Sequence, residues 1–387
     1  MKVMKISADV RKYEHFVIEQ RRKLHAIPEL AEEEKETAAY IEEQLRLLRP
    51  DSLERLFRTG VKAVFLAKNP KKTIGLRADM DALPVQEPDD CSFRSVHEGK
   101  MHACGHDGHM AIMLGMAALI AQKRDVLENS YVLIFQPAEE ADGGAQPMID
   151  EGVLENPKVD EVYGLHIWPY LEAGKIGIKP GPLMAGMRDI NVDIIGKSAH
   201  GARPQHGTDA VVAAAQFVNQ AQTIISRNVD PVDTAVLTLG VIKGGEARNI
   251  VCDHVHMEGT LRTFDDGVAD MVKGRLYDIL SGLERGMGVE TRCYETMAFP
   301  AVVNDWALAQ RAKERLDESD IAHAEKVMIS EDFSCYQRKV PGLFVFLGVK
   351  DEGHDAPLHT KEFGFDEKYL LTGMEYVARM AELSDEK

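Results

Sequence analysis

The densest cluster of reactive side chains lies between His102 and His109, where three imidazoles, a thiol and a carboxylate occur within eight residues. In this run, HACGHDGH, Cys104 and His106 are two residues apart and can both project from one turn into one cavity. Cysteine and histidine together suit borderline metals such as zinc. The cluster therefore predicts a metal site, against the alternative of a polar loop around a buried structural cysteine.

A second candidate is the adjacent pair Glu139 and Glu140, which follows the apolar run 131–135. Neighbouring carboxylates repel each other unless something positive lies nearby. If Glu140 binds a metal ion, Glu139 can stand beside the metal-bound water and accept its proton, which is the division of labour that metal-assisted hydrolysis needs. The alternative is a solvated acidic turn.

Two isolated histidines, His166 and His359, bring the candidate ligands to five. A single histidine in either place is more often a satisfied core group than a ligand. Two tetrahedral ions have about eight coordination positions, and five protein ligands, one of them bridging, fill six. A bridging hydroxide would fill the remaining two, so five ligands could serve a pair of ions. Asp79, soon after the apolar run 74–76, could hold a ligand imidazole in its metal-binding tautomer, with Asp81 as the alternative.

The elements that must position these residues alternate between short apolar runs and helical stretches. The short runs are typical of strands buried on both faces, and the helical stretches carry apolar residues at three- and four-residue steps. The alternation predicts an α/β domain with a mixed, mostly parallel sheet flanked by helices. In such sheets ligands bind beyond the carboxyl ends of the strands. The predicted strands are 64–66, 74–76, 131–135, 162–165 and 343–347, and the predicted helices are 10–24, 33–48 and 110–123.

The middle of the chain, between Pro182 and Pro300, has a different pattern. Its order of strand, helix, strand, strand, helix, strand is that of a ferredoxin-like α+β domain. The predicted elements are 190–194, 209–226, 234–241, 250–261, 266–283 and 289–298. We therefore predict a catalytic metal-binding domain made of 1–182 and 299–387, with an inserted domain over 183–298.

The inserted domain adds three candidate residues, His200, Asn249 and Arg262. A histidine in a glycine-flanked loop can donate a hydrogen bond to a developing oxyanion. Asparagine and arginine at strand ends suit a carboxylate, to which arginine offers a bidentate fork. Each could equally be an ordinary surface residue.

Composition narrows the class of protein. The 387 residues are 44% hydrophobic and 28% charged, which excludes a disordered or fibrous chain. The formal charge of −17 disfavours nucleic-acid binding, and no stretch approaches the ~20 apolar residues that span a bilayer. Five scattered cysteines and an N-terminus without an apolar signal region fit a cytoplasmic protein.

Taken together and in order, five motifs closely resemble the amidohydrolase branch of the aminoacylase-like dinuclear metallopeptidases. The motifs are HACGHDGH at 102–109, QPAEE at 136–140, HIWP at 166–169, SAHGARP at 198–204 and SEDFS at 330–334. That branch holds the N-acyl-L-amino-acid amidohydrolases, including hippurate hydrolases, indole-acetyl-amino-acid hydrolases and N-acetyldiaminopimelate deacetylases. The resemblance spans nearly the whole chain.

The resemblance implies a zinc-exopeptidase-like metal domain with an inserted lid domain that also mediates dimerisation. It implies two divalent ions per subunit, with Cys104 bridging them, held by Cys104, His106, Glu140, His166 and His359. Glu139 would be the general base and later the general acid, supported by Asp79. His200 would reach a neighbouring subunit's active site to stabilise the oxyanion, and Asn249 and Arg262 would hold the substrate's α-carboxylate.

We therefore expect a cytoplasmic homodimer or tetramer that hydrolyses N-acyl-L-amino acids, with acetyl, benzoyl or similar acyl groups. Metal-bound hydroxide would attack the carbonyl while Glu139 shuttles the proton. The metal could be manganese, zinc, cobalt or nickel. The alternatives are a dipeptidase or carboxypeptidase on the same scaffold, and a non-catalytic binding protein that uses the inserted domain for assembly.

Overall fold

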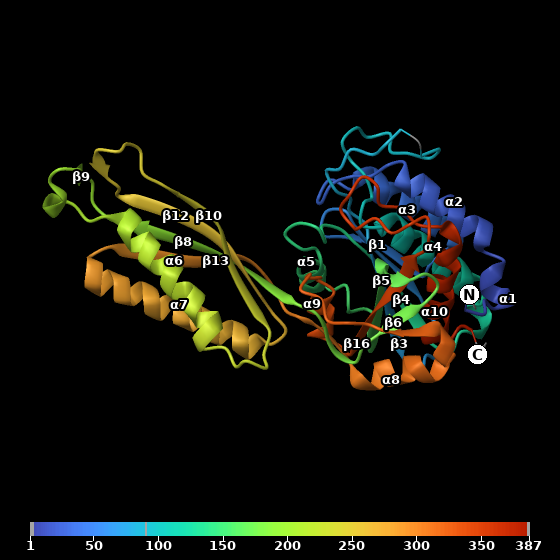
Figure 1. Ribbon diagram of the computed structural model, residues 1–387. Coiled ribbons are helices and arrows are strands. Elements are labelled where there is room, and N and C mark those ends of the chain that lie inside the picture. The colour runs from blue at the N-terminus through green and yellow to red at the C-terminus, as the bar shows by residue number, and fades with distance from the viewer. Residues whose placement is uncertain (1–3, 90, 385–387) are drawn as a thin grey trace. The chain divides into compact units, whose positions relative to one another are not determined.

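The chain passes through two structural units, each built around its own apolar core (Figure 1). The computed structural model describes residues 4–89 and 91–384. The larger unit consists of Met1–Leu183, Val303–Glu325 and Asp332–Lys387, and the inserted unit of Met184–Val302 and Lys326–Glu331. The inserted unit thus also takes in a short segment, 326–331, that lies beyond the predicted insertion.

The larger unit contains an eight-stranded sheet in the order β1-β2-β4-β3-β5-β16-β6-β15. Its centre, from β4 through β3 and β5 to β16, is parallel, while β1 and β2 are antiparallel to their neighbours. This confirms the predicted mixed sheet. The strands are β1 (Ser52–Leu56), β2 (Gly60–Phe65), β3 (Thr73–Asp79), β4 (Ser130–Gln136), β5 (Glu161–Glu172), β6 (Ile176–Ile178), β15 (Ile321–His323) and β16 (Gly342–Lys350), with the short strands β7 (Gly181–Met184) and β14 (Val302–Asn304) where the chain passes between the units.

Strand β16 shows why the central strands are largely apolar. Successive side chains point to opposite faces of a sheet, and both faces are covered here. Val345 and Leu347 belong to the core that includes helices α4 and α10, whereas Phe344 packs against Phe333 and Phe346 stacks on Trp168. The helices are α1 (Ala8–Arg11), α2 (Glu14–His25), α3 (Lys35–Leu48), α4 (His106–Gln122), α5 (Ala145–Asp150), α8 (Trp306–Arg315), α9 (Ser334–Gln337) and α10 (Leu370–Met380).

Helix α4 carries the metal-site motif at its first turn and is buried over almost its whole length. It is apolar all round, as expected of a helix enclosed by other elements. Gly108, in its first turn, permits this packing, because a Cβ there would lie 2.5 Å from Cδ1 of Ile167 in β5. The start of α4 is thereby pressed against the strand that carries His166.

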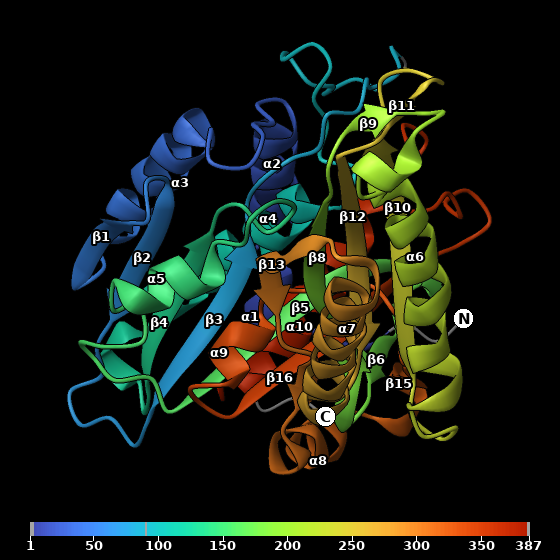
Figure 2. The same cartoon turned by 90° about the vertical axis from the view of Figure 1, so that its left-hand side faces the viewer.

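The inserted unit has the ferredoxin-like arrangement that the sequence predicted. Its four antiparallel strands follow the order β10-β12-β8-β13, and helices α6 and α7 lie side by side on one face (Figure 2). The elements are β8 (Gly186–Ile195), β9 (Ala199–His200), α6 (Ala210–Arg227), β10 (Ala235–Gly244), β11 (Ile250–Val251), β12 (His254–Thr263), α7 (Asp266–Met287) and β13 (Glu290–Phe299).

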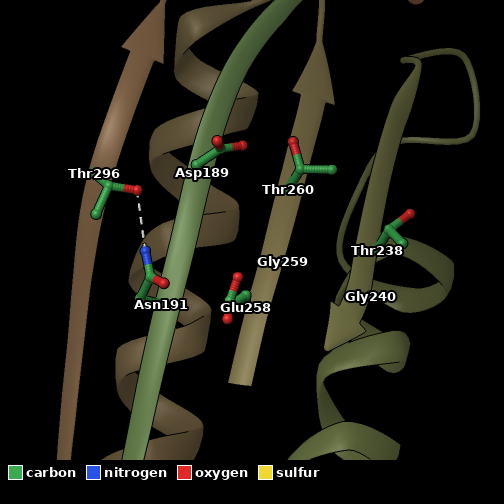
Figure 3. A pocket seen from close by; sticks show the side chains of 8 residues that line it. All are labelled: Asp189, Asn191, Thr238, Gly240, Glu258, Gly259, Thr260 and Thr296. Atoms are coloured by element: carbon green, nitrogen blue, oxygen red, sulfur yellow. Dashed lines mark hydrogen bonds between the residues drawn. The ribbon is translucent and has the colours of Figure 1, made fainter. Parts of the chain in front are cut away.

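The other face of this sheet is polar, because its side chains alternate with those of the core. Ile190 and Val192 face the helices, while Asp189 and Asn191 line an open hollow in which the Asn191 amide donates to Thr296 Oγ1 at 3.1 Å (Figure 3). None of the predicted site residues lines this hollow within the part of the chain that is described. Over the same ranges, no helix is both long and apolar enough to cross a lipid bilayer.

Candidate metal centre

The candidate metal centre lies at the carboxyl ends of the central parallel strands. Asp79 is the last residue of β3 and pairs in register with Gln136, the last residue of β4. His106 is the first residue of α4, directly after Gly105, whose φ of +85° turns the chain into the helix. His166 lies within β5, since that strand continues well beyond the predicted run. This is the edge at which α/β sheets bind their ligands.

The five predicted ligands converge around the thiol of Cys104. Its Sγ lies 3.4 Å from Nε2 of His166 and 3.3 Å from Nε2 of His359. Oε1 of Glu140 lies 3.1 Å from Nε2 of His359 and 3.9 Å from Nε2 of His106. Side chains that are up to 255 positions apart in the chain thus present one sulfur, three nitrogens and a carboxylate to a common point.

Two of the imidazoles are held in the tautomer that a metal ligand requires. Nδ1 of His106 lies 2.9 Å from the carbonyl oxygen of Asp81, and Nδ1 of His166 lies 2.7 Å from that of Ile167. Each Nδ1 must carry a proton to donate to a carbonyl, so Nε2 is the nitrogen directed into the cluster. Against the effect of burial, the carboxylates of Asp79, Asp81 and Glu140 raise the pKa of His106 to about 10, so an ion would take the place of its Nε2 proton. Burial lowers the pKa of His166 to about 3, so this ring is neutral near pH 7.

The chemistry and burial of these side chains fit divalent metal ions. Nε2 of His106 is buried without a hydrogen-bond partner, which is costly unless another ligand satisfies it. Burial and the carboxylates of Glu140 and Glu139 raise the pKa of the Cys104 thiol well above its ordinary value. A divalent cation would reverse this shift, because thiolate, imidazole and carboxylate are the groups that bind it.

Glu139 and Glu140 stand on a turn that is held from two sides by buried acids. Ala138 has φ of +57°, and its N–H donates to Oε1 of Glu34 at 2.9 Å. The N–H of Glu140 donates to Oδ2 of Asp81 at 2.9 Å. In this turn, oxygens of Glu139 and Glu140 and a nitrogen of His106 lie within 4.8 Å of one another. Glu139 is therefore beside the candidate metal centre, as its predicted role requires.

Asp79 is buried behind the cluster and contacts an imidazole that is not among the predicted ligands. Its Oδ1 accepts from Nδ1 of His109 at 2.6 Å, whereas Nδ1 of His106 lies 3.8 Å away. Nε2 of His109 in turn accepts from the N–H of Ile167 at 2.8 Å. Asp79 thus holds His109, which in turn binds the backbone N–H next to His166. The backbone carbonyl of Asp81 orients His106.

Sequence reasoning missed the functional importance of three positioning residues. Arg77 donates to Asp79 at 2.8 Å and to Asp332 at 2.9 Å, and Asp332 also accepts from the Gln136 amide. Glu34 is fully buried and supports the turn described above. Asp332 lies in the SEDFS motif, which pointed to this segment but not to the role of Asp332. Nothing in the sequence distinguishes Glu34 from other acids near helix starts.

In the inserted unit, the structure brings together two of the three predicted residues. His200 in β9 pairs with Ile250 in β11, and the carbonyl of Asn249 accepts from the N–H of Gly201 at 2.7 Å. Arg262 lies toward the other end of β12, where it donates to Thr260 Oγ1 at 2.6 Å. Strand β12 begins at His254, eight residues before Arg262. At ~3.3 Å per residue, the strand between these two residues is about 26 Å long. His200 and Asn249 lie beyond that start, so the distance from Arg262 exceeds the length of a small substrate.

Known proteins share this chain's sequence and fold over most of its length. The model of peptidase family M20/M25/M40 matches residues 75–383. An N-acetyldiaminopimelate deacetylase of Priestia megaterium is 40% identical over 353 residues, which cover 89% of this chain and 93% of the relative. An N-acetyl-L-cysteine deacetylase of Bacillus subtilis is 39% identical over 91% of this chain and 84% of its own length.

A solved structure gives the same result. The crystal structure of a dinuclear metal-binding peptidase of the M20 family from Bacillus subtilis has a TM-score of 0.83 and 33% identity, covering 96% of this chain and 98% of that one. These similarities confirm the resemblance inferred from the motifs, and with it the prediction of a metal-dependent amidohydrolase. The chain therefore belongs to peptidase family M20/M25/M40.

Proposed function

We propose that this chain hydrolyses the amide bond of N-acyl-L-amino acids, and that N-acetyl amino acids are its main substrates. The observation that carries the proposal is the convergence of Cys104, His166 and His359 with the adjacent carboxylates Glu139 and Glu140. Relatives named for removing the acetyl group from N-acetyldiaminopimelate and N-acetyl-L-cysteine support the substrate class.

In this proposal five side chains, among them Cys104, would hold two divalent ions. When bound, such ions polarise the scissile carbonyl and make water a better nucleophile at neutral pH. Their ligands are Cys104, His106, Glu140, His166 and His359. Of the four candidate metals, zinc suits the thiolate, but affinity alone does not select the ion that works in a cell, so manganese, cobalt and nickel stay candidates.

Glu139 is the proposed general base. Its carboxylate lies next to the ligand Glu140 and accepts a proton from the attacking water molecule. As the tetrahedral species collapses, the same group returns the proton to the leaving amide nitrogen. The turn that carries it is fixed through the backbone of Ala138 and Glu140, so the carboxylate is positioned before substrate binds.

For substrate binding we propose roles for the three residues of the inserted unit. His200 donates a hydrogen bond to the oxyanion of a neighbouring subunit's substrate, while Asn249 and Arg262 bind the α-carboxylate. Since Arg262 is more than about 26 Å from the other two along one chain, one substrate cannot touch all three within a subunit. Two chains would therefore contribute to each site, which supports the proposed homodimer. The cytoplasmic location is proposed with it.

A substrate panel tests the function. The purified chain, loaded separately with manganese, zinc, cobalt or nickel, is assayed with N-acetyl and N-benzoyl amino acids and with dipeptides. The proposal expects the highest kcat/KM for an N-acyl amino acid. A preference for dipeptides would support the alternative peptidase, and no hydrolysis with any metal would support a non-catalytic binding protein.

A further inference from the structure

A second group of metal-binding side chains lies outside the candidate metal centre. It consists of His25 at the end of α2 together with Glu87 and Cys91, which precede the HACGHDGH motif in the chain. One possible ligand atom from each of the three lies within 4.8 Å of the others. His25 and Glu87 are buried and Cys91 is half-buried. None of the three has a part in the proposed hydrolysis.

The imidazole of His25 is oriented as metal-binding histidines are. Its Nδ1 lies 2.9 Å from Oδ2 of Asp107, and this carboxylate is itself fixed by Nε of Arg21 at 3.0 Å. A carboxylate that binds one ring nitrogen of histidine directs the other nitrogen to the metal. Here the other nitrogen, Nε2, faces Oε1 of Glu87 at 2.8 Å.

Glu87 is likewise aimed at this point. Its second oxygen accepts the N–H of Ser95 at 2.6 Å, which leaves Oε1 for His25 or for an ion. A tetrahedral ion between Nε2 and Oε1 would need them about 3.4 Å apart, since each bond is about 2.0–2.2 Å long. The two atoms would therefore have to separate by roughly half an ångström, a small adjustment for a side chain on a loop.

The local charges leave room for a cation. Two arginines near this group, Arg21 and Arg22, are each paired with a carboxylate, Asp107 and Glu367 respectively. Against the effect of burial, hydrogen bonds to Asp107, Cys91 and Glu87 raise the pKa of His25 well above its ordinary value, so an ion would have to replace a proton of this imidazole. The histidine, carboxylate and thiolate would then form a mixed N, O and S set, which suits zinc better than magnesium or calcium. Half-buried Cys91 gives an ion a route from solvent.

We propose that His25, Glu87 and Cys91 bind a third divalent ion of the zinc class, with Asp107 as the carboxylate that orients His25. The ion would join Glu87 and Cys91 to the end of α2. Because Asp107 directly follows His106, the same ion would also brace the first turn of α4. The site would be structural, since its imidazole, carboxylate and thiol would all be used as ligands.

Protection of the Cys91 thiol tests the proposal. Of the five cysteines, Cys104, Cys252 and Cys335 are buried, so a thiol-specific reagent reports mainly on Cys91 and Cys293. In the manganese-loaded C293S variant, Cys91 is the accessible thiol that remains. Adding zinc is expected to slow its reaction at least about tenfold. The E87Q change, made in the same background, should remove most of this protection while keeping the shape of the side chain.

The number of metal ions bound per chain is an independent test of the proposal. The zinc-saturated wild-type chain should hold one ion more than the C91S variant, while the matched variant C293S should equal the wild type. Equal metal content in wild type and C91S, or thiol reactivity that zinc does not change, would overturn the proposal. His25 would then be a protonated imidazole bridging Asp107 and Glu87 without any ion. Circular dichroism of each variant checks that it is folded.

Discussion

At the scale of single residues, Arg77 stands out because two buried carboxylates depend on it. It donates to Asp79 and Asp332 at 2.8 and 2.9 Å, and all three side chains are almost fully buried. The R77A substitution removes this cation from both acids, and we expect it to lower the free energy of unfolding by about 3–5 kcal/mol. Urea unfolding measures this. The exposed R285A substitution should change it by less than about 0.5 kcal/mol, and an equally small effect at Arg77 would contradict the reading.

Glu139 gives the sharpest prediction about catalysis. The E139Q substitution removes the proton acceptor but leaves the proposed metal ligands in place. We expect kcat for an N-acetyl amino acid to fall by about 10²–10⁴-fold with unchanged metal content. The exposed E352Q substitution serves as the control. A normal kcat for E139Q would exclude Glu139 as the base.

The individual site residues differ in how far the sequence could reveal them. Cys104, His106 and Glu140 stand in short runs dense in metal-binding side chains, so their spacing alone pointed to a site. His166 and His359 gained weight only as members of a set. The partner of Asp79 could not be predicted, because His106 and His109 share one helix turn and only the tertiary packing shows that His109 is the closer.

At the scale of elements, the turn after β4 depends on a buried acid. Burial raises the pKa of Glu34 to about 7 from near 4.5, while its hydrogen bonds to Thr59 and the Ala138 N–H favour the charged form less strongly. The folded chain therefore binds more protons than the unfolded chain between pH 4.5 and 7. The associated stability, about 3 kcal/mol, is present below pH 4.5 and is lost as the pH rises through 7.

The E34Q substitution tests this linkage. Glutamine has the same shape and no charge, so the decline in the free energy of unfolding between about pH 4.5 and 7 should become shallower. Urea unfolding over a pH series measures the slope. A variant whose slope equals that of the wild type would show that Glu34 does not titrate in this window.

The elements predicted best are the strands that are buried on both faces of the sheet. The central strands β3, β4 and β16 are apolar on both faces, so short hydrophobic runs located them. Strand β1 was missed because it lies at the sheet edge and is nowhere fully buried. The predicted helix 10–24 is two helices, α1 and α2, that are separated by a turn at Lys12 and Tyr13 which no glycine or proline signals.

At the scale of the whole molecule, the two units should respond differently to loss of metal. All five proposed ligands belong to the larger unit, and the two apolar cores share no residue. Ligand binding at 100 times Kd stabilises a fold by about 2.7 kcal/mol, so a chelator should lower the melting temperature of the larger unit alone. Calorimetry with and without chelator measures the melting temperatures. Spectroscopic signals from residues of each unit then assign each transition to its unit. An equal shift in both units would contradict it.

We propose above that one thiol, three imidazoles and a carboxylate jointly hold two metal ions. Anomalous scattering from crystals of the zinc-loaded chain tests it directly. We predict two peaks among Cys104, His106, Glu140, His166 and His359, each within about 2.0–2.3 Å of ligand atoms, separate from the third peak expected at His25, Glu87 and Cys91. The absence of anomalous peaks near Cys104 in a fully loaded crystal would contradict it.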